Sequence, residues 1–197
     1  WDGYKSSVNK KVVKFVPASG AASRMFKDLF EFLDASYYVP TTAFEKAFFD
    51  GLSKFAFYSD LDKICEKNEN KNIQQLLAED NYKAIVENLL LPKGLNYGNL
   101  PKGLLRFHKY QDGERTPVEE HLMEGALYAK NGSGVVNIHF TVSPEHRVMF
   151  EKLVRHVKTV FEDEQDAEYN VSFSVQKPNT DTIAADENNE PFREDGV

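Results

Sequence analysis

Apolar residues recur along this chain with two periods, one typical of strands and one typical of helices. Short β-branched and aromatic runs occupy 11–16, 135–142 and 169–175, and we predict that they are strands. Helical spacing fills 116–130 before the second run and 143–164 after it. Strands that alternate with helices are typical of a parallel sheet with crossover helices. We therefore predict an α/β protein with a Rossmann-like parallel sheet that contains all three strands.

Helix starts can be placed from capping residues. Thr116 and Ser143 each precede a proline, so we predict that both are N-caps with proline at the first helical position. Thr42 stands three residues before Glu45, which is the spacing of a capping box. The segment 24–35, after the first strand, also has helical spacing.

The middle of the chain, 36–100, has helical spacing and no strand pattern. We predict helices over 41–58 and 72–91 that pack on each other through Phe and Leu faces. The segments 60–69 and 72–91 together predict two or three helices after residue 58. A Pro/Gly/Asn loop closes the segment at 92–103. We therefore expect one α/β domain over 1–197 with a helical insertion at 36–100.

Composition places the chain among ordinary globular proteins. It has 197 residues, of which 41% are hydrophobic and 28% charged, and this argues against a disordered or fibrous chain. No apolar run approaches the roughly 18–20 residues of a membrane helix. No signal peptide is recognisable, and we expect a cytoplasmic protein without membrane contact. The last strand leads into a polar tail, so we expect that the natural chain continues and that this one is truncated.

The net charge of −7, from 24 basic and 31 acidic residues, disfavours nucleic acid as a partner. Four lysines between Lys5 and Lys14 form a local basic run, which the solvated start of a strand explains better. The single cysteine, Cys65, excludes a disulfide within the chain and a cysteine-built zinc site. Its helical spacing with Leu61 and Ile64 predicts a small buried residue. The histidines have no metal-ligand spacing, and the oligomeric state stays open.

The loop after the first strand is the first candidate for chemistry. It consists almost entirely of small residues, namely Ala18, Ser19, Gly20, Ala21, Ala22 and Ser23, followed by Arg24. Small side chains let backbone N–H groups approach a phosphate, and a helix that starts near Ser23 points its positive end at it. Arginine suits phosphate oxygens. The loop matches neither the P-loop nor the G-x-G-x-x-G pattern. A tight turn with a surface arginine remains the alternative.

Two further residues are candidates for the same kind of site. Lys102 follows a proline in a loop, from which it can reach a phosphate, although a solvated lysine is the default interpretation. Gln176 ends the third strand, where its amide can contact a base edge or cap a turn.

These segments carry a resemblance. KFVPASGAASRMFKDLFEF, LNYGNLPKGLLRFHKY, TPVEEHLMEGALY, VNIHFTVSPEH and VSFSVQKPNTDTIA together resemble an uncharacterised bacterial family, domain of unknown function 4301. The resemblance covers nearly the whole chain. It implies no assigned activity, and it implies that the chain normally continues past Val197 with further strands.

A more distant resemblance is to the sugar-nucleotide pyrophosphorylases, which are nucleotidyltransferases. VPASGAASRM is similar to their L-A-G-G-x-G-T-R loop, and PKGLLRF to their P-K-x-L-L-P-V segment. The resemblance implies that the loop from Gly20 to Ser23 cradles nucleotide phosphates and that Arg24 neutralises them. It implies that Lys102 holds the phosphate of the sugar donor or the pyrophosphate, that Gln176 contacts the base, and that Mg²⁺ assists.

The chain also departs from that pattern. Alanines and a serine, at Ala18, Ser19, Ala21 and Ala22, stand where the pyrophosphorylases have adjacent glycines, and Arg106 replaces the second proline of the P-K segment. The metal-holding aspartates of those enzymes have no clear match here, and neither Asp181 nor Asp186 is assigned to that role.

We expect transfer of a nucleotidyl group between a nucleoside triphosphate and a sugar phosphate or similar acceptor, with Arg24 and Lys102 as the candidate catalytic residues. Two alternatives stay open. One is a non-catalytic module that binds a nucleotide or nucleotide sugar. The other is an interaction protein that uses the aromatic residues of the insertion, Phe48, Phe49, Phe55, Phe57 and Tyr58, as a partner surface.

Overall fold

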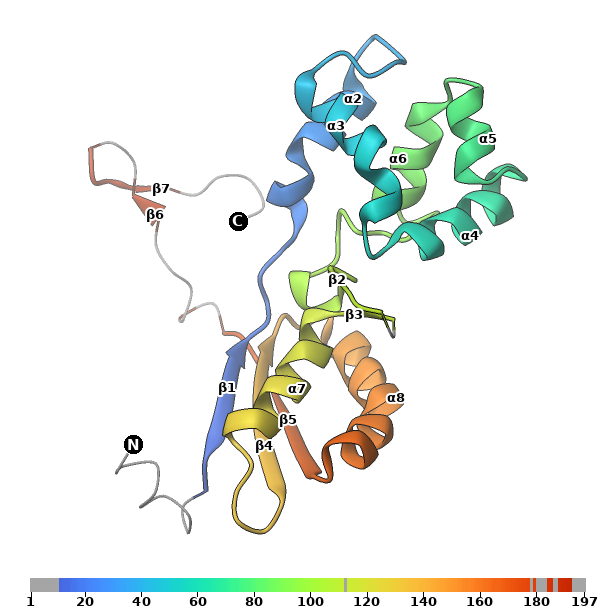
Figure 1. Cartoon of the computed structure of the whole chain (residues 1–197). Coiled ribbons are helices and arrows are strands. Elements are labelled where there is room, and N and C mark those ends of the chain that lie inside the picture. The colour runs from blue at the N-terminus through green and yellow to red at the C-terminus, as the bar shows by residue number, and fades with distance from the viewer. Residues whose placement is uncertain (1–10, 112, 178, 180–183, 186–187, 193–197) are drawn as a thin grey trace.

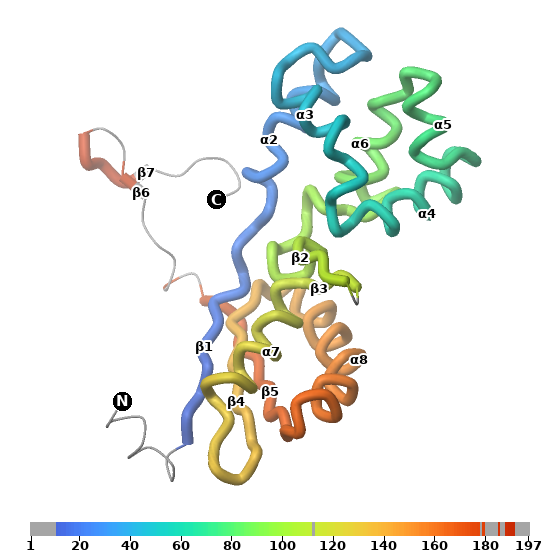
Figure 2. Tube along the Cα trace, in the orientation of Figure 1, coloured from blue at the N-terminus to red at the C-terminus, as the bar shows by residue number. Residues whose placement is uncertain are grey.

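A computed structural model of the chain describes residues 11–111, 113–177, 179, 184–185 and 188–192. The described residues form an α/β lobe and a helical lobe (Figure 1). The Cα trace starts in the α/β lobe, passes through the helical lobe and returns to the α/β lobe (Figure 2). Within the described ranges, no helix combines the length and the apolar character that crossing a bilayer requires.

The α/β lobe contains a parallel sheet of three strands. β1 (Val13–Pro17), β4 (Val135–Val142) and β5 (Glu168–Val175) lie in the order β1-β4-β5, with both neighbouring pairs parallel. Phe140 in the central strand is in register with Val16 of β1 and Phe173 of β5. The α/β class and the predicted parallel sheet are therefore confirmed.

Two helices cover one face of this sheet, α7 (Pro117–Tyr128) and α8 (Arg147–Gln165). The buried residues of that face alternate along β4 with polar ones, as expected for a sheet covered on one side. A Cβ on Gly125 would lie 2.9 Å from the side chains of both Val136 and Ile138, so glycine lets α7 approach β4 closely. The core of this lobe, the sheet core, includes Val118, Leu122, Val136, Ile138, Phe140, Val142, Phe150 and Tyr169.

The opposite face of the sheet carries mainly polar groups on its two later strands. His139 lies 2.8 Å from the Ser172 hydroxyl through Nδ1 and 2.8 Å from the Ser174 hydroxyl through Nε2. Its ring stacks on Phe15 with centroids 5.3 Å apart. His139 is half-buried, and both ring nitrogens have partners. Lys14, from the basic run, is buried on the helix-covered face and pairs with Glu124, whose side chain is half exposed, so the expected solvated start of the strand is wrong for this lysine.

The two proline-containing helix starts have different outcomes. The Thr116 hydroxyl accepts from Glu119 N at 3.3 Å, and the Glu119 carboxylate accepts from Thr116 N at 2.7 Å, so the predicted cap of α7 is confirmed. The predicted cap at Ser143 is wrong, because α8 begins only at Arg147. The Ser143 hydroxyl instead lies 2.8 Å from Nδ1 of His146, and that contact takes the place of a backbone cap.

The helical lobe contains no strand between residues 36 and 100, all of which the structure describes. Its helices are η1 (Ser23–Phe26), α2 (Lys27–Asp34), α3 (Ala43–Gly51), η2 (Leu52–Lys54), α4 (Tyr58–Glu69), α5 (Ile73–Ala78) and α6 (Tyr82–Leu90). The helical character of 41–58 and 72–91 is confirmed, as is the number of helices after residue 58. The capping box of Thr42 and Glu45 starts α3 as predicted.

Helix continuity over 41–58 was wrongly expected. The chain leaves the helix after Lys54 and turns, so that Phe55 stacks on Phe57 with centroids 5.0 Å apart. Residues two apart on a helix point in different directions, so this stack requires the turn. The segment 72–91 is also interrupted, at Asp80, whose φ of 55° is left-handed.

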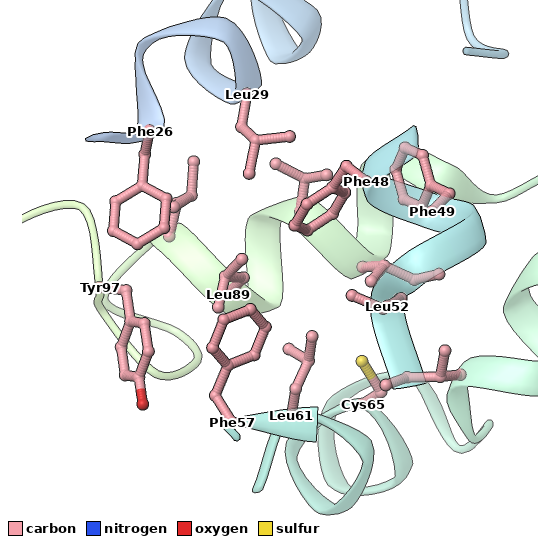
Figure 3. Packing of buried hydrophobic residues seen from close by; sticks show 14 of the residues in the cluster. Phe26, Leu29, Phe48, Phe49, Leu52, Phe57, Leu61, Cys65, Leu89 and Tyr97 are labelled. Atoms are coloured by element: carbon pink, nitrogen blue, oxygen red, sulfur yellow. The ribbon is translucent and has the colours of Figure 1, made fainter. Parts of the chain in front are cut away.

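The helical lobe has a core of its own, which we call the helical core, and α2 is part of it. Phe26 and Leu29 pack with residues of α3, α4 and α6 (Figure 3). Phe49 of α3 meets Tyr82 of α6 edge to face, with centroids 4.8 Å apart, as the predicted packing requires. Cys65 is fully buried there, which confirms its predicted place. Phe48, Phe49 and Phe57 are also buried, so most of the aromatic residues considered as a partner surface are core.

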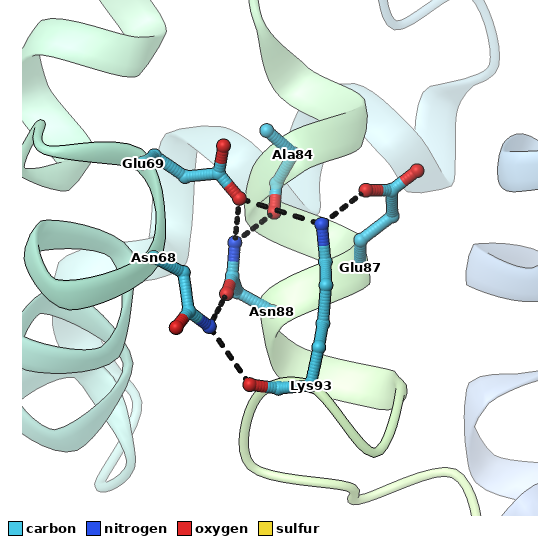
Figure 4. Close-up of polar contacts among 6 residues, drawn as sticks. All are labelled: Asn68, Glu69, Ala84, Glu87, Asn88 and Lys93. Atoms are coloured by element: carbon cyan, nitrogen blue, oxygen red, sulfur yellow. Dashed lines mark hydrogen bonds and ion pairs between the residues drawn. The ribbon is translucent and has the colours of Figure 1, made fainter.

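A buried amide ties α4 to α6. Asn88 is fully buried, accepts from Asn68 Nδ2 at 2.6 Å and donates to a carboxylate oxygen of Glu69 at 2.8 Å (Figure 4). Lys93 lies 3.4 Å from the same carboxylate oxygen. A Cβ on Gly94 would overlap the backbone of Asn88, so the loop after α6 can close over the network only with glycine there.

Short elements complete the fold. η3 (Lys102–Leu104) connects the lobes, and β2 (His108–Lys109) pairs with β3 (Glu114–Arg115) as an antiparallel hairpin that the periodicity did not predict. Strands of two residues are too short to show an alternating pattern. β6 (Ala184–Ala185) and β7 (Pro191–Phe192) form a second small antiparallel pair.

Candidate functional site

The loop that follows β1 lies at the carboxyl edge of the parallel sheet. Ala18 N donates to Thr141 O at 2.7 Å, which extends the β1–β4 ladder past Pro17. Ala18 is buried in the sheet core and Ala22 in the helical core. The side chains of these two alanines hold the loop in place, whereas Gly20 and Ala21 between them are exposed.

A second segment runs antiparallel to this loop. Ala21 forms an isolated bridge with Pro101, Ala22 N donates to Leu100 O at 3.3 Å, and Lys102 N donates to Gly20 O at 3.0 Å. The backbone therefore brings Lys102 directly beside Gly20. The loop and the Pro-Lys segment, both singled out in the sequence, lie together.

Gln176 reaches the same edge from β5. Its backbone N donates to Val142 O at 2.9 Å, and its side-chain oxygen accepts a hydrogen bond from the Ser19 hydroxyl. The ends of β1 and β5 are thus linked across the end of the central strand. All three sequence-predicted segments lie at one edge of the sheet, which in open parallel sheets is the edge where ligands bind.

The space beside Gly20 is open. A Cβ built on Gly20 would have no heavy atom within 4 Å, and the residue is not in the left-handed region. Neither packing nor backbone conformation therefore requires glycine at this position. A small residue here does leave room for a ligand to approach the backbone.

Arg24 and Lys102 are the cations of this edge, and both side chains are exposed. Among the described residues, neither side chain has an ion-pair or hydrogen-bond partner. Both charges are thus available to an anion from solution.

The helix start near Ser23 differs from the expectation. Ser23 and Arg24 belong to η1, a four-residue 3-10 turn whose N-cap, Ala22, makes no side-chain cap hydrogen bond. The α-helix proper, α2, begins only at Lys27. The candidate loop therefore does not lead directly into the N-terminus of an α-helix, and a phosphate there would depend on Arg24 and Lys102 for its positive charge.

The turn after β4 contributes residues that the sequence analysis did not select. His146 Nδ1 lies 2.8 Å from the Ser143 hydroxyl and 3.5 Å from a carboxylate oxygen of Glu145. A hydrolytic triad needs serine and carboxylate on opposite ring nitrogens, whereas both contact the same nitrogen here. The arrangement therefore gives no acyl-transfer site. Its only sequence signal is the polar run Ser-Pro-Glu-His at a strand end.

Two hollows lie elsewhere on the α/β lobe. One of about 660 Å³ is lined by residues of the α8–β5 turn and Gly134, and one of about 280 Å³ by residues of all three strands and Lys158. None of the predicted site residues lines either hollow. No group of three His, Cys, Asp or Glu side chains in the described ranges could hold a metal ion. Asp181 and Asp186 lie outside the described residues.

Comparison with known proteins identifies the family of the chain. A search of curated proteins and a search of solved structures found no match to this chain. A family model described as "Domain of unknown function (DUF4301)" matches residues 1–196. The match covers the strands, the helical lobe and all the candidate site segments, and the chain therefore belongs to this family.

Proposed function

We propose that the chain binds the phosphates of a nucleotide or nucleotide sugar at the carboxyl edge of its sheet and serves in nucleotidyl transfer. The observation that carries the proposal is the backbone pairing of Gly20 with Lys102, because it joins the two segments that resemble the phosphate-binding motifs of sugar-nucleotide pyrophosphorylases. The resemblance was drawn from sequence, and the pairing is an independent property of the fold.

The chemistry of these residues suits a phosphate. Gly20 leaves room for close approach to the backbone, and the exposed Arg24 and Lys102 offer charge that no described side chain neutralises. A guanidinium can hold two phosphate oxygens at once, and an ammonium acts as a point charge. Gln176, linked to the loop through Ser19, is our candidate for contact with the base.

In nucleotidyl transfer, a phosphate oxygen of the acceptor forms a bond to the α-phosphorus of the triphosphate. The bond from that phosphorus to the β-phosphate oxygen breaks, and pyrophosphate leaves. Arg24 and Lys102 would stabilise the negative charge that develops on the phosphates. The described residues do not offer a set of Mg²⁺ ligands, so we assign no residue to the metal and derive no step through it.

Calorimetry with UTP and with a UDP-sugar tests the proposal. We expect Arg24→Ala and Lys102→Ala each to weaken binding about ten- to hundredfold, as the loss of roughly 1.5–3 kcal/mol from a charge-assisted hydrogen bond implies. Gly20→Val should weaken binding as much by filling the open space, without loss of fold stability. Arg155→Ala, an exposed arginine on α8, is the matched control.

Circular dichroism confirms that each variant is folded. If the Arg24, Lys102 and Gly20 variants all bind like the parent, the loop is only a turn and the proposal is wrong. Release of pyrophosphate from UTP and a sugar phosphate separates an enzyme from a binding module.

A further inference from the structure

The two lobes have separate hydrophobic cores. No residue belongs to both the helical core and the sheet core, and the partly buried Leu104 is the described residue that packs against both. Lobes that share so little buried apolar surface are expected to move relative to each other, because little free energy holds them in one arrangement.

The chain passes between the lobes through a short ribbon. The segment 18–22 runs from Ala18 in the sheet core to Ala22 in the helical core, and the segment 100–102 lies beside it between Leu100 and Leu105, which are both in the helical core. These two segments form the antiparallel pair between Gly20–Ala22 and Leu100–Lys102. Hydrogen bonds across such a ribbon keep the two segments together, but they leave the ribbon free to bend and twist. A Cβ built on Gly20 would have no heavy atom within 4 Å, so no tight side-chain packing surrounds the ribbon at that position.

The third connection is the β2–β3 hairpin. On the helical side, Arg106 N donates to the Tyr97 hydroxyl at 3.2 Å, and the Arg106 guanidinium lies 3.1 Å from Asp60. On the other side, Arg115 lies 3.8 Å from Glu120 of α7. Gly113, with φ of 143°, stands in the turn between these two anchors. Each end of the hairpin is thus attached to a different lobe.

The candidate site residues are attached to different lobes. Arg24 shares its 3-10 turn with Phe26, which is buried in the helical core. Gln176 is bonded to β4 through Val142 O. The turn that carries Lys102 contacts both lobes, because a Cβ on Gly103 would lie 2.9 Å from the ring of Phe150 in α8, whereas Leu100 and Leu105 on either side of the turn are buried in the helical core. A movement between the lobes would therefore move Arg24 relative to Gln176, which is held by the sheet.

We propose that the helical lobe is a closing arm that swings on the paired segments 20–22 and 100–102 and carries Arg24 onto phosphates held at the sheet edge. The identity of the ligand rests on the proposed function, whereas the swing of the lobes does not. A ligand closes the arm only as far as it binds the closed arrangement more tightly than the open one. Contact between the phosphates and Arg24 in the closed arrangement supplies that difference in affinity.

Distances between spin labels test the swing without a ligand. We choose Lys67→Cys on α4 and Lys152→Cys on α8, two exposed lysines in different lobes. Cys65 can stay, because it is fully buried and burial raises the pKa of its thiol to about 12, so it does not compete for the label. Pairs within one lobe, Lys67 with Lys46 and Lys152 with Leu127, are the controls.

We expect a clearly broader distance distribution for the pair between lobes than for either control pair. Equal widths in all three pairs would overturn the proposal, since the lobes would then be one rigid body. With UTP added, the distribution between lobes should narrow and shift to one closed distance. In Arg24→Ala it should stay broad when UTP is added at a concentration that saturates the variant.

The UTP experiment separates the two proposals. If calorimetry detects no binding of UTP, the proposed function fails, and the swing is judged on the ligand-free distributions alone. If UTP binds and the distribution between lobes does not change, the closing arm is overturned while the nucleotide site stands.

Discussion

Glu45 shows how a charged side chain can be stable inside the helical lobe. Only 3% of the residue is exposed, and burial acts to raise the pKa of its carboxyl group. Hydrogen bonds outweigh that effect. The carboxylate accepts from Thr41 N at 2.6 Å, from Thr42 N at 3.0 Å and from the Tyr37 hydroxyl at 2.8 Å, and the pKa of Glu45 is therefore lowered from 4.5.

The lowered pKa makes stability depend on pH in a defined direction. The unfolded chain binds a proton near pH 4.5, and the folded protein binds it only at lower pH. The stability that ionised Glu45 contributes is thus present above about pH 4.5 and is lost as the pH falls through the folded pKa. In Glu45→Gln, we expect lower stability at neutral pH and a smaller loss on acidification, measured by urea unfolding between about pH 3 and 7.

The control for this experiment is Glu66→Gln, which removes an exposed carboxylate from α4. It should leave the pH dependence of the parent nearly unchanged. A Glu45→Gln protein with the same acid slope as the parent would show that Glu45 is not differently protonated in the folded and unfolded states.

The starts of α7 and α8 show that the same sequence motif can have two outcomes. Thr116 and Ser143 each precede a proline, yet only Thr116 caps its helix, because Glu119 completes a capping box three residues later. The third residue after Ser143 is His146, whose imidazole contacts the hydroxyl. A glutamate three residues after the cap thus accompanies a capping box at Thr116, and a histidine at the same spacing from Ser143 does not.

This difference predicts unequal effects of two similar substitutions. We expect Thr116→Ala to lower the free energy of unfolding by about 1 kcal/mol, because it leaves backbone N–H groups of α7 without a partner. Ser143→Ala should lower the free energy of unfolding by only a few tenths of that amount, since the Ser143 side chain accepts no hydrogen bond from a backbone N–H of α8. Urea unfolding of both variants measures the difference, and equal losses would contradict this account of the two caps.

The separation of the two cores determines which part of the protein loses stability when a core residue is substituted. Leu61 in the helical core and Leu122 in the sheet core are both fully buried. Each Leu→Ala substitution creates a cavity and should cost about 2–5 kcal/mol. Because the cores share no buried residue, the loss of stability should be confined mainly to the lobe that carries the substitution.

Native-state hydrogen exchange of Leu61→Ala and Leu122→Ala tests this expectation. In Leu61→Ala, amides of α4 and α6 should exchange faster while those of β4 keep their protection. In Leu122→Ala, amides of β4 should exchange faster while those of α4 and α6 keep their protection. Equal loss of protection in both lobes for both variants would show that the chain unfolds as a single cooperative unit.

Much of the fold could be predicted because its signals are local. The β-branched and aromatic runs of the three strands and the helical spacing around them each lie within a few consecutive residues. The interruptions of the helical lobe could not be predicted in the same way. At Phe55 the chain turns and two aromatic rings stack, and the spacing of apolar residues does not distinguish that turn from a continued helix.

The candidate site was likewise only partly predictable from sequence. Residue types alone singled out the small loop, Lys102 and Gln176 as groups suited to a phosphate and a base. Their assembly required the folded chain, since Ser19 and Gln176 are 157 residues apart in sequence and meet only because β1 and β5 flank β4 in one parallel sheet. Arg24 is a further case, because its attachment to the helical lobe depends on where Phe26 is buried.

Periodicity and capping act between residues a few positions apart, so the amino-acid order was enough to establish the three strands of the parallel sheet, the helical character of the segments between them and the starts of α3 and α7. The pairing of 20–22 with 100–102, the division into two cores and the gathering of the site at one sheet edge came only from tertiary structure. These features depend on which apolar surfaces bury each other, and that choice is made among segments far apart in the chain.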